Sequence, residues 1–340
     1  MKGARVYLDY IKGREIAVLM IDGQLEDVFV ENDAPSPGTV YRAIADRPIK
    51  GQGGLFLKTP DGSAFLRQVK GVAPGQELLV QVSGYAEPGK AIPVTQKLLF
   101  KSRYAIVTPL SPGVNVSRNI RDKTEIDRLL EIAHEGGCSR NDGVILRSAA
   151  AGADADALAD DLSAMLELAR AVATDASTGM EVLTQGNGPH ELAWRDWAVQ
   201  GDVVSDAGCL ERDGVLDMLR LASGPATTLP QGASFFVEPT RAFVAVDVNT
   251  GPDGSMAAAL KANLATARAL PRVLRLRGLG GQIVVDVAPL PKKDRRPFET
   301  ALRQAFRADD TETALVGWTP LGHYELQRKR ARAPLSEALI

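Results

Sequence analysis

Cysteines and long apolar runs are scarce in this sequence. The two cysteines among its 340 residues, Cys138 and Cys209, lie far apart and in no metal-ligand spacing. A disulfide framework and a cysteine-based zinc site are therefore not supported, and we expect both thiols to be reduced. No stretch approaches the roughly 20 apolar residues of a membrane-spanning helix. The N-terminal stretch MKGARVYLDYIKGREIAVLM alternates apolar and polar residues, unlike a signal peptide, so we expect a cytoplasmic protein.

A large charge of one sign is absent as well. The formal net charge is −2, so any binding of a polyanion must come from local basic patches. Aromatic residues make up only 5% of the chain beside 32 glycines and 20 prolines, which predicts many turns and short strands. The length predicts more than one domain. Three basic patches lie in the last third of the chain, each alternatively a solvated helix face or loop: Arg268, Arg272, Arg275 and Arg277; Lys292, Lys293, Arg295 and Arg296; Arg328, Lys329, Arg330 and Arg332.

Short strands with closely spaced turns fill residues 38–101. Five strands in this length are typical of a small closed barrel, of which the OB fold is the commonest five-stranded form. Phe56 and Phe65 lie on neighbouring predicted strands joined by a turn at residues 60–62. Exposed aromatic side chains on such a barrel stack on unpaired bases, whereas the same residues turned inward would belong to its core.

Two apolar strands in the last third each carry one aspartate near their end. The segment SFFVEPTRAFVAVDVNTG, residues 234–251, predicts two strands around a turn, and alternation places Asp247 and Asn249 on one face of the second. Asp286 has an equivalent place in GGQIVVDVAPL. A helix, which Pro271 is expected to kink or restart, lies between them. The right-handed crossover of such a strand-helix-strand unit sets the strands parallel and brings both aspartates to one sheet edge.

These aspartates predict a metal site. An ionised carboxylate surrounded by valines is costly unless it is paired or bound to a metal ion, and two carboxylates about 4 Å apart repel by roughly 4 kcal/mol at an effective dielectric near 20. Mg²⁺ removes both problems, because one or two carboxylates, water and substrate phosphate typically hold it. Asn263, on the intervening helix, is a polar side chain that could face this site. The alternative is that Asp247 and Asp286 are solvent-facing ends of strands.

The predicted strand at residues 143–150 ends near Arg147 and Ser148. A guanidinium beside a hydroxyl offers several hydrogen-bond donors that suit a phosphate group. Taken alone, this pair is a weak signal.

Three separated segments carry a resemblance to a known family. FVEPTRAFVAVDVNTG, NLATARALPRVLRLRGLGGQIVVDV and LGHYELQRKRARAPL occur in the order found in the catalytic region of the RNase E/G family of endoribonucleases, which residues 229–340 resemble. VTPLSPGVNVSRNI resembles that family's link out of its S1-like RNA-binding barrel, and GVILRSAAAG resembles its 5′-monophosphate-sensing segment. The resemblance implies an Mg²⁺-dependent endoribonuclease that hydrolyses single-stranded RNA to products with 5′-phosphate ends, in RNA processing or decay such as rRNA maturation.

The family's architecture implies a multi-subdomain fold of the α+β and α/β classes. Its parts would be an RNase H-like subdomain split over residues 1–35 and 178–228, an inserted S1-like OB-fold barrel at 36–105, a 5′-sensor region at 106–177 and a DNase I-like catalytic subdomain at 229–340.

The same resemblance implies roles for particular residues. Asp247 and Asp286 would ligate the catalytic Mg²⁺, and Asn249 would orient Asp247 or assist with the metal and the scissile phosphate. The further roles are 5′-phosphate binding by Arg147 and Ser148, and contact with the RNA backbone by a helix that carries Arg328, Lys329 and Arg330. RNA binding by Phe56 and Phe65 is expected from their place on the predicted barrel and not from this resemblance.

The chain departs from the family pattern in three places. The family's zinc-binding Cys-Pro-x-x-Cys segment and small dimerisation domain are missing after the catalytic region, so we expect a monomer or homodimer and no zinc-linked tetramer. Ser148 stands where the family usually has Thr. The segment before Ser234 is abbreviated, and a Pro-Leu-Pro run replaces an acidic residue expected after Asp286. Two other interpretations stay open: a non-cleaving RNA-binding protein that uses the barrel and the basic patches, and a phosphatase or DNA nuclease that shares only the two aspartates.

Overall fold

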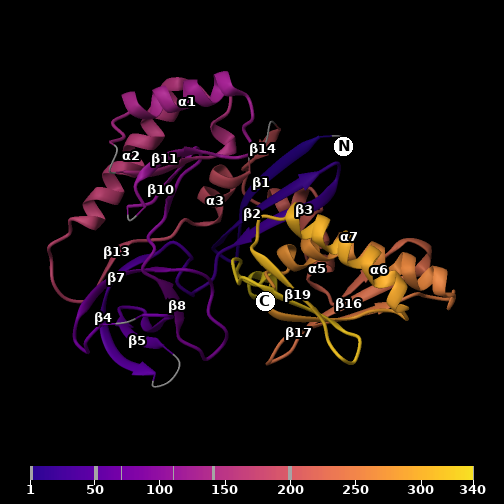
Figure 1. Cartoon of the computed structure of the whole chain (residues 1–340). Helices are drawn as coiled ribbons and strands as arrows, with labels where there is room; N and C mark the ends of the chain where they lie inside the picture. Colours follow the sequence, from indigo (N-terminus) through magenta and orange to yellow (C-terminus); the bar gives the residue numbers. More distant parts are fainter. Residues whose placement is uncertain are drawn as a thin grey trace. The chain divides into compact units, whose positions relative to one another are not determined.

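The computed structural model describes residues 3–49, 53–69, 71–109, 111–139, 142–197 and 201–339. The chain forms two compact units (Figure 1). Unit 1 combines Met1–Asn32 with Val199–Ile340, and unit 2 comprises Asp33–Ala198. Both contain helices and strands, so the fold is mixed α+β, as predicted. None of the helices within these described ranges is both long and apolar enough to cross a membrane.

Unit 2 begins with a closed five-stranded barrel. The strands follow the order β4-β5-β6-β8-β7, and β7 pairs back onto β4 to close the ring. Alternate residues such as Leu55, Leu57 and Leu66 fill its interior, which confirms the predicted closed five-stranded barrel. Its strands are β4 (Val40–Ile49), β5 (Gly54–Thr59), β6 (Gly62–Leu66), β7 (Glu77–Val82) and β8 (Ile92–Thr95). A further strand, β13 (Glu181–Thr184), pairs antiparallel with the start of β4.

The rest of unit 2 is a small sheet with helices. The sheet has the order β11-β12-β10-β9, and α1 and α2 each begin at an aspartate, Asp122 and Asp154, whose carboxylate accepts a hydrogen bond from a backbone N–H of the first turn. The predicted domain boundary at residue 178 falls inside this unit, because β13 and α3 remain with it. The elements are β9 (Phe100–Lys101), β10 (Ala105–Val107), β11 (Gly113–Val116), β12 (Gly143–Leu146), α1 (Lys123–Glu135), α2 (Ala155–Ala173) and α3 (Pro189–Asp196).

Unit 1 contains a four-stranded sheet built from both of its chain segments. The antiparallel meander β1-β2-β3 receives β14 parallel to β1. Asp9 of β1 is buried and accepts hydrogen bonds from the backbone N–H groups of Gly208 and Leu210 at the start of α4. Burial alone would raise the pKa of Asp9, but these hydrogen bonds outweigh it and lower the pKa. The elements are β1 (Ala4–Ile11), β2 (Arg14–Ile21), β3 (Gln24–Val30), β14 (Asp202–Val204), α4 (Cys209–Arg212) and α5 (Val215–Ser223).

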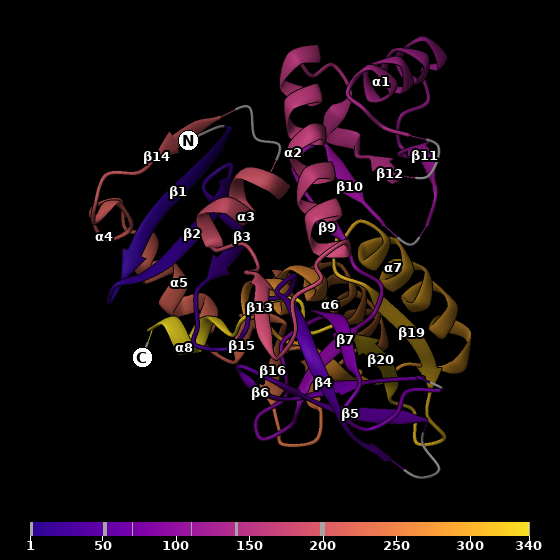
Figure 2. The same ribbon diagram turned by 90° about the vertical axis from the view of Figure 1, so that its left-hand side faces the viewer.

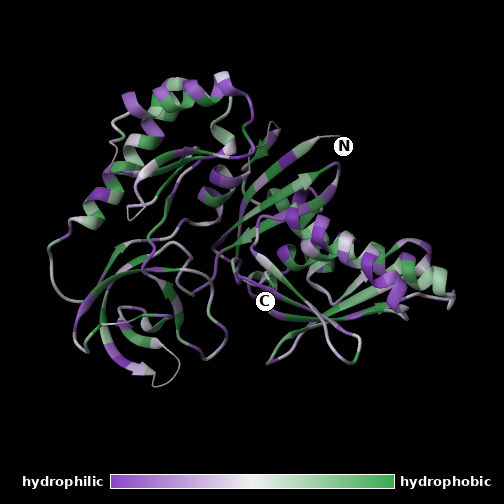
Figure 3. Ribbon diagram, in the orientation of Figure 1, coloured by the Kyte–Doolittle hydropathy of each residue, from purple (hydrophilic) through white to green (hydrophobic). Residues whose placement is uncertain are grey.

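A six-stranded sheet, ordered β15-β16-β17-β18-β20-β19, forms the remainder of unit 1 (Figure 2). Valines and isoleucine from β17 and β18 pack with buried residues of α6 and α7 into one core, and both helices carry hydrophobic and hydrophilic residues (Figure 3). Helix α6 continues through Pro271, so the predicted restart at this proline is wrong. The elements are β15 (Ala226–Thr228), β16 (Ser234–Pro239), β17 (Val244–Asn249), β18 (Gly281–Asp286), β19 (Thr313–Trp318), β20 (Tyr324–Arg328), α6 (Met256–Leu276), α7 (Arg295–Arg307) and α8 (Leu335–Leu339).

A buried cluster of ion pairs connects the two sheets of unit 1. Arg275 of α6 pairs with Asp309, and its Nε lies 3.4 Å from Oδ1 of Asp27 on β3. Arg328 at the end of β20 lies 2.9 Å from the other oxygen of Asp309, and Arg332 pairs with Asp27 at 2.8 Å. Asp309 and Arg328 each expose only 1% of their side chains, so each depends on the other for compensation of its charge.

Candidate metal centre and nucleic-acid interface

Asp247 and Asp286 lie side by side on adjacent strands. Strands β17 and β18 are parallel, and these two aspartates are Cα partners at the carboxyl ends of the strands. The predicted parallel pair and shared edge are therefore confirmed. Val246 and Val285 are buried on the opposite face of the sheet, and 66% of the Asp286 side chain is exposed. The expectation that valines surround these carboxylates is wrong, because alternation along each strand separates them from the valines.

Two polar side chains adjoin the aspartate pair. The amide Nδ2 of Asn249 donates a hydrogen bond of 2.9 Å to Oδ2 of Asp247, and both side chains lie on the exposed face of β17. The predicted sharing of one face by these residues is confirmed. His323, which directly precedes β20, has its Nε2 3.6 Å from Oδ1 of Asp286.

The aspartate pair fits a small divalent cation with an incomplete protein shell. Like charges directly opposite on neighbouring strands are unfavourable, which a cation between them would reverse. Among the residues with described positions, no three histidine, cysteine or acidic side chains come together as metal ligands. A cation here would thus take two carboxylates from the chain and the rest of its ligands from water and substrate, the arrangement that Mg²⁺ commonly adopts.

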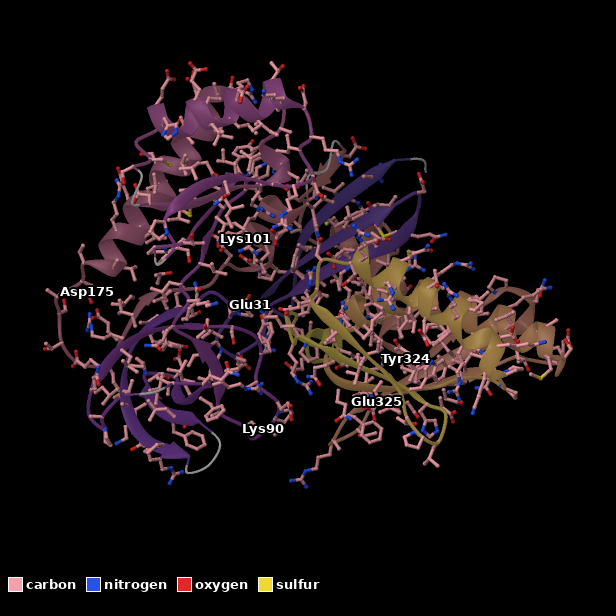
Figure 4. All side chains as sticks on the ribbon, in the orientation of Figure 1. Glu31, Lys90, Lys101, Asp175, Tyr324 and Glu325 are labelled. Carbon is pink, nitrogen blue, oxygen red and sulfur yellow. The ribbon has the colours of Figure 1, made fainter. Side chains whose placement is uncertain are left out.

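Further carboxylates occupy the same face of the sheet. Glu238 of β16 is a Cα partner of Ala245, which pairs with Val284 and through it with Glu325 of β20. These four residues form one row across the strands, and on the same face it lies beside the row that contains Asp247 and Asp286. Tyr324 and Glu325, both labelled in Figure 4, are consecutive in β20, and Tyr324 is buried in the core while Glu325 is half-buried. The exposed face therefore favours cations and disfavours an RNA phosphate that arrives without one.

Asn263 does not face the metal site. It is fully buried on α6, where its Nδ2 donates to the carbonyl oxygen of Ala288 at 2.9 Å and its Oδ1 accepts from the N–H of Ala288 at 3.0 Å. The prediction that this side chain faces the site is wrong. It instead fixes the backbone that follows Asp286, because one side-chain amide satisfies both backbone polar groups of a buried residue.

The predicted basic helix at residues 328–330 is also wrong. Arg328 is the last residue of strand β20, and residues 329–334 form no helix. The Arg328 side chain lies in the buried ion-pair cluster with Asp309, where it cannot reach an RNA backbone. Burial lowers the pKa of its guanidinium, against the opposing effect of Asp309. Lys329 is exposed and Arg330 is half-buried, so of the three predicted RNA contacts these two keep some accessible surface.

Arg147 and Ser148 lie where β12 ends. Ser148 is exposed and begins a short 3-10 helix, Ser148–Ala150. The Arg147 guanidinium donates hydrogen bonds to the backbone carbonyls of Ser102, Arg103 and Arg195, and forms an ion pair of 2.8 Å with Asp196. These bonds tie β12 to α3. Binding of a phosphate by Arg147 stays a prediction.

Phe56 and Phe65 project outward from the barrel. They are Cα partners on β5 and β6, their ring centroids lie 5.3 Å apart, and both side chains are half-buried. The guanidinium of Arg47 lies 5.4 Å from the Phe56 centroid. Gly54 leaves the space that the Phe65 ring occupies, since a Cβ there would lie 2.3 Å from its Cζ atom. The outward orientation agrees with an aromatic stacking surface, with a cation beside it.

Two residues beside the aspartates, His323 and Phe236, were not predicted from the sequence as site residues. His323 lies in the segment LGHYELQRKRARAPL, but its sequence context alone assigns it no role. Phe236 was expected only as a strand residue, yet it is the Cα partner of Asp247 across the β16–β17 hairpin and is 36% exposed. The pairing register of the predicted hairpin would have revealed Phe236, but this register depends on the length of the turn.

Comparison with known proteins identifies a family for this chain. The profile of the Ribonuclease E/G family matches residues 100–204 and 202–331. The chain belongs to the Ribonuclease E/G family. Ribonuclease G of Salmonella typhimurium is 26% identical over 394 aligned residues, which cover 96% of this chain and 80% of that protein. Ribonuclease E of Nostoc is 25% identical over 377 aligned residues, which cover 93% of this chain and 54% of that protein.

Membership in the Ribonuclease E/G family confirms the predicted resemblance. The chain spans only about half of the Nostoc ribonuclease E, and 37% of ribonuclease E from Escherichia coli at 26% identity. The alignments of 377 and 394 positions are longer than the chain's 340 residues, so these members of the family have segments without a counterpart here.

Proposed function

We propose that this protein is an Mg²⁺-dependent endoribonuclease that cleaves single-stranded RNA, in RNA processing or decay such as rRNA maturation. The observation that carries the proposal is the register of Asp247 and Asp286 on adjacent parallel strands, on the exposed face of a sheet. Relatives named ribonuclease E and ribonuclease G support RNA as the substrate.

The residues of the chain would prepare the phosphodiester for attack by water. Asp247 and Asp286 would each offer carboxylate oxygens to the cation, and the hydrogen bond from Asn249 holds the Asp247 carboxylate in one orientation. When bound, the cation supplies a Lewis acid that offsets the growing charge on the phosphate and activates a water. Attack on phosphorus would break the bond to the 3′ oxygen, so the products would have 5′-phosphate and 3′-hydroxyl ends.

Unit 2 would supply the contacts that select RNA. In this proposal the barrel is the S1-like element, and Phe56 and Phe65 stack on unpaired bases. The small sheet with α1 and α2 is the 5′-sensor region, where Arg147 and Ser148 would bind a 5′-phosphate. In unit 1, the four-stranded sheet would be the RNase H-like subdomain and the six-stranded sheet the DNase I-like subdomain, in a monomer or homodimer.

A second candidate function is RNA binding without cleavage. The outward aromatic pair on the barrel favours it, because this surface needs no metal ion to bind RNA.

One assay separates the two functions. Purified protein is incubated with 5′-monophosphorylated and 5′-hydroxyl single-stranded RNA oligonucleotides, in Mg²⁺ or in EDTA, and the ends of any products are mapped. We expect cleavage in Mg²⁺ alone, with 5′-phosphate products. Binding without cleavage, with a salt dependence of about −0.7 per neutralised phosphate, would favour the second function. A faster rate on monophosphorylated RNA that Ser148→Ala abolishes would support the 5′-sensor role.

A further inference from the structure

The open face of the six-stranded sheet exposes an aromatic side chain. Along β16, Phe235 and Val237 are fully buried in the core, while Phe236, between them, is 36% exposed. Within the parts of this sheet that the structure describes, the other large exposed hydrophobic side chain is Val316 of the edge strand β19. This partly exposed ring lies on a face otherwise rich in carboxylates, where its free surface is available to a ligand.

The register of the sheet places this ring beside the candidate metal centre. Phe236 is the Cα partner of Asp247, which is the Cα partner of Asp286. Directly opposite residues on neighbouring antiparallel strands have Cβ atoms about 4.5–5.5 Å apart on the same face. On its other side, Phe236 pairs with Ala226, whose short side chain leaves that flank of the ring uncovered. The ring is thus the immediate neighbour of a group expected at the scissile phosphate.

We propose that Phe236 stacks on the nucleobase next to the scissile phosphate and so positions single-stranded RNA for cleavage. This inference rests on the proposed ribonuclease function and adds a substrate-positioning residue to it. A nucleobase is the occupant that this surface fits, because the carboxylates around the ring would be desolvated by an apolar protein partner, whereas an RNA strand can bring its phosphate to the cation and its base to the ring. Stacking would also favour unpaired RNA, since neighbouring base pairs cover both faces of a base inside a duplex.

The test combines a change in the protein with a change in the RNA. An RNA with one wild-type cleavage site is prepared intact and with an abasic ribose on either side of the scissile bond, and kcat/KM is measured for wild type, Phe236→Ala and Phe236→Trp. The control Val316→Ala removes exposed apolar surface from the same sheet, away from the aspartates. Thermal unfolding of each variant verifies that it folds.

We expect Phe236→Ala to reduce kcat/KM on intact RNA by about 5- to 150-fold, the range for loss of one base–aromatic stack. On one of the two abasic RNAs the wild type should lose a similar factor, and Phe236→Ala should then cause little further loss. Phe236→Trp keeps an aromatic face and should lose less activity than Phe236→Ala, whereas Val316→Ala should cleave like the wild type. Equal losses for Phe236→Ala on intact and on both abasic RNAs, or no loss on intact RNA, would overturn the proposal.

Failure of the proposed function has a different signature. If wild type does not cleave any RNA, fluorescence anisotropy with intact and fully abasic oligonucleotides still tests the stack. Weaker binding of intact RNA alone by Phe236→Ala would then support stacking in a protein that does not cleave. An unchanged affinity for both RNAs would overturn it.

Discussion

Substitution of Asn263 by alanine tests how the chain holds the end of β18 in place. The Asn263 amide makes two hydrogen bonds to the backbone of one residue, donating to the Ala288 carbonyl at 2.9 Å and accepting from the Ala288 N–H at 3.0 Å. Asn263 is 0% exposed and Ala288 is 4% exposed. Asn263→Ala therefore leaves a buried donor and a buried acceptor without their partner.

The expected cost follows from these two bonds. Each buried polar group that loses its partner costs about 1–3 kcal/mol, so the free energy of unfolding of unit 1 should fall by about 2–6 kcal/mol. That is a large share of the roughly 5–15 kcal/mol that stabilises a typical domain. Thr266, on the same helix, provides a matched control, because it is also 0% exposed and its hydroxyl has no hydrogen-bond partner within the described residues. Thr266→Val should leave the stability unchanged or increase it.

The assay is equilibrium urea unfolding of the full chain, followed by circular dichroism and by tryptophan fluorescence. Trp318 reports on unit 1, because it packs against Phe298 and Tyr324 in that core with ring centroids 5.7 and 5.1 Å away. Trp194 and Trp197 report on unit 2. The transition of unit 1 should shift in Asn263→Ala, and that of unit 2 should not. A loss below about 0.5 kcal/mol, or an equal loss in Thr266→Val, would refute the amide clamp.

Three further outcomes are expected. Asp309→Ala should lower the free energy of unfolding of unit 1, measured in urea, by about 3–5 kcal/mol, because it leaves the buried Arg328 unpaired. The double variant Asp309→Leu/Arg328→Met should recover part of this loss. No loss in Asp309→Ala would contradict the ion-pair cluster. Phe56→Ala and Phe65→Ala should each weaken the binding of single-stranded RNA, measured by fluorescence anisotropy, by about 5- to 150-fold. Ser63→Ala is the neutral control. An unchanged affinity would assign both rings to the packing of the barrel. The hydrogen bond from Arg128, followed by that from the Gly152 N–H, lowers the pKa of Glu125 from 4.5 to about 2. The ionised carboxylate therefore stabilises the fold fully above about pH 4.5, and this stabilisation disappears as the pH falls toward 2. Between about pH 5 and pH 3 the unfolding temperature should fall less in Glu125→Gln than in wild type, and an equal fall in both would refute this effect.

Periodicity along the chain predicted the parts of the structure that depend on local pattern. The alternation in β17 places Asp247 and Asn249 on one face, as expected. The strand-helix-strand order predicted the parallel pairing of Asp247 with Asp286, because the handedness of such crossovers is almost invariant. The barrel followed from the number and spacing of its strands.

Partners distant in the sequence decided the rest. A polar residue on an apolar helix can face a site or a buried peptide, and only the position of Ala288 distinguishes the two for Asn263. Arg328 stands in a basic run that looks exposed, yet strand alternation turns it inward, where Asp309 compensates its charge. Arg147 donates hydrogen bonds to three backbone carbonyls and pairs with Asp196, and no local sequence motif predicts these partners.

Cleavage of a 5′-monophosphorylated single-stranded RNA as a function of Mg²⁺ concentration tests the central claim most directly, with wild type, Asp247→Asn and Asp286→Asn compared. Each substitution keeps the size of the side chain and removes one carboxylate from the pair on β17 and β18. Wild type should cleave with a saturable dependence on Mg²⁺ and stop in EDTA. Both variants should remain folded and lose at least about a hundredfold in rate at saturating Mg²⁺, as expected when electrostatic stabilisation at the reacting phosphate is lost. Cleavage at the wild-type rate by the double variant Asp247→Asn/Asp286→Asn would contradict the account.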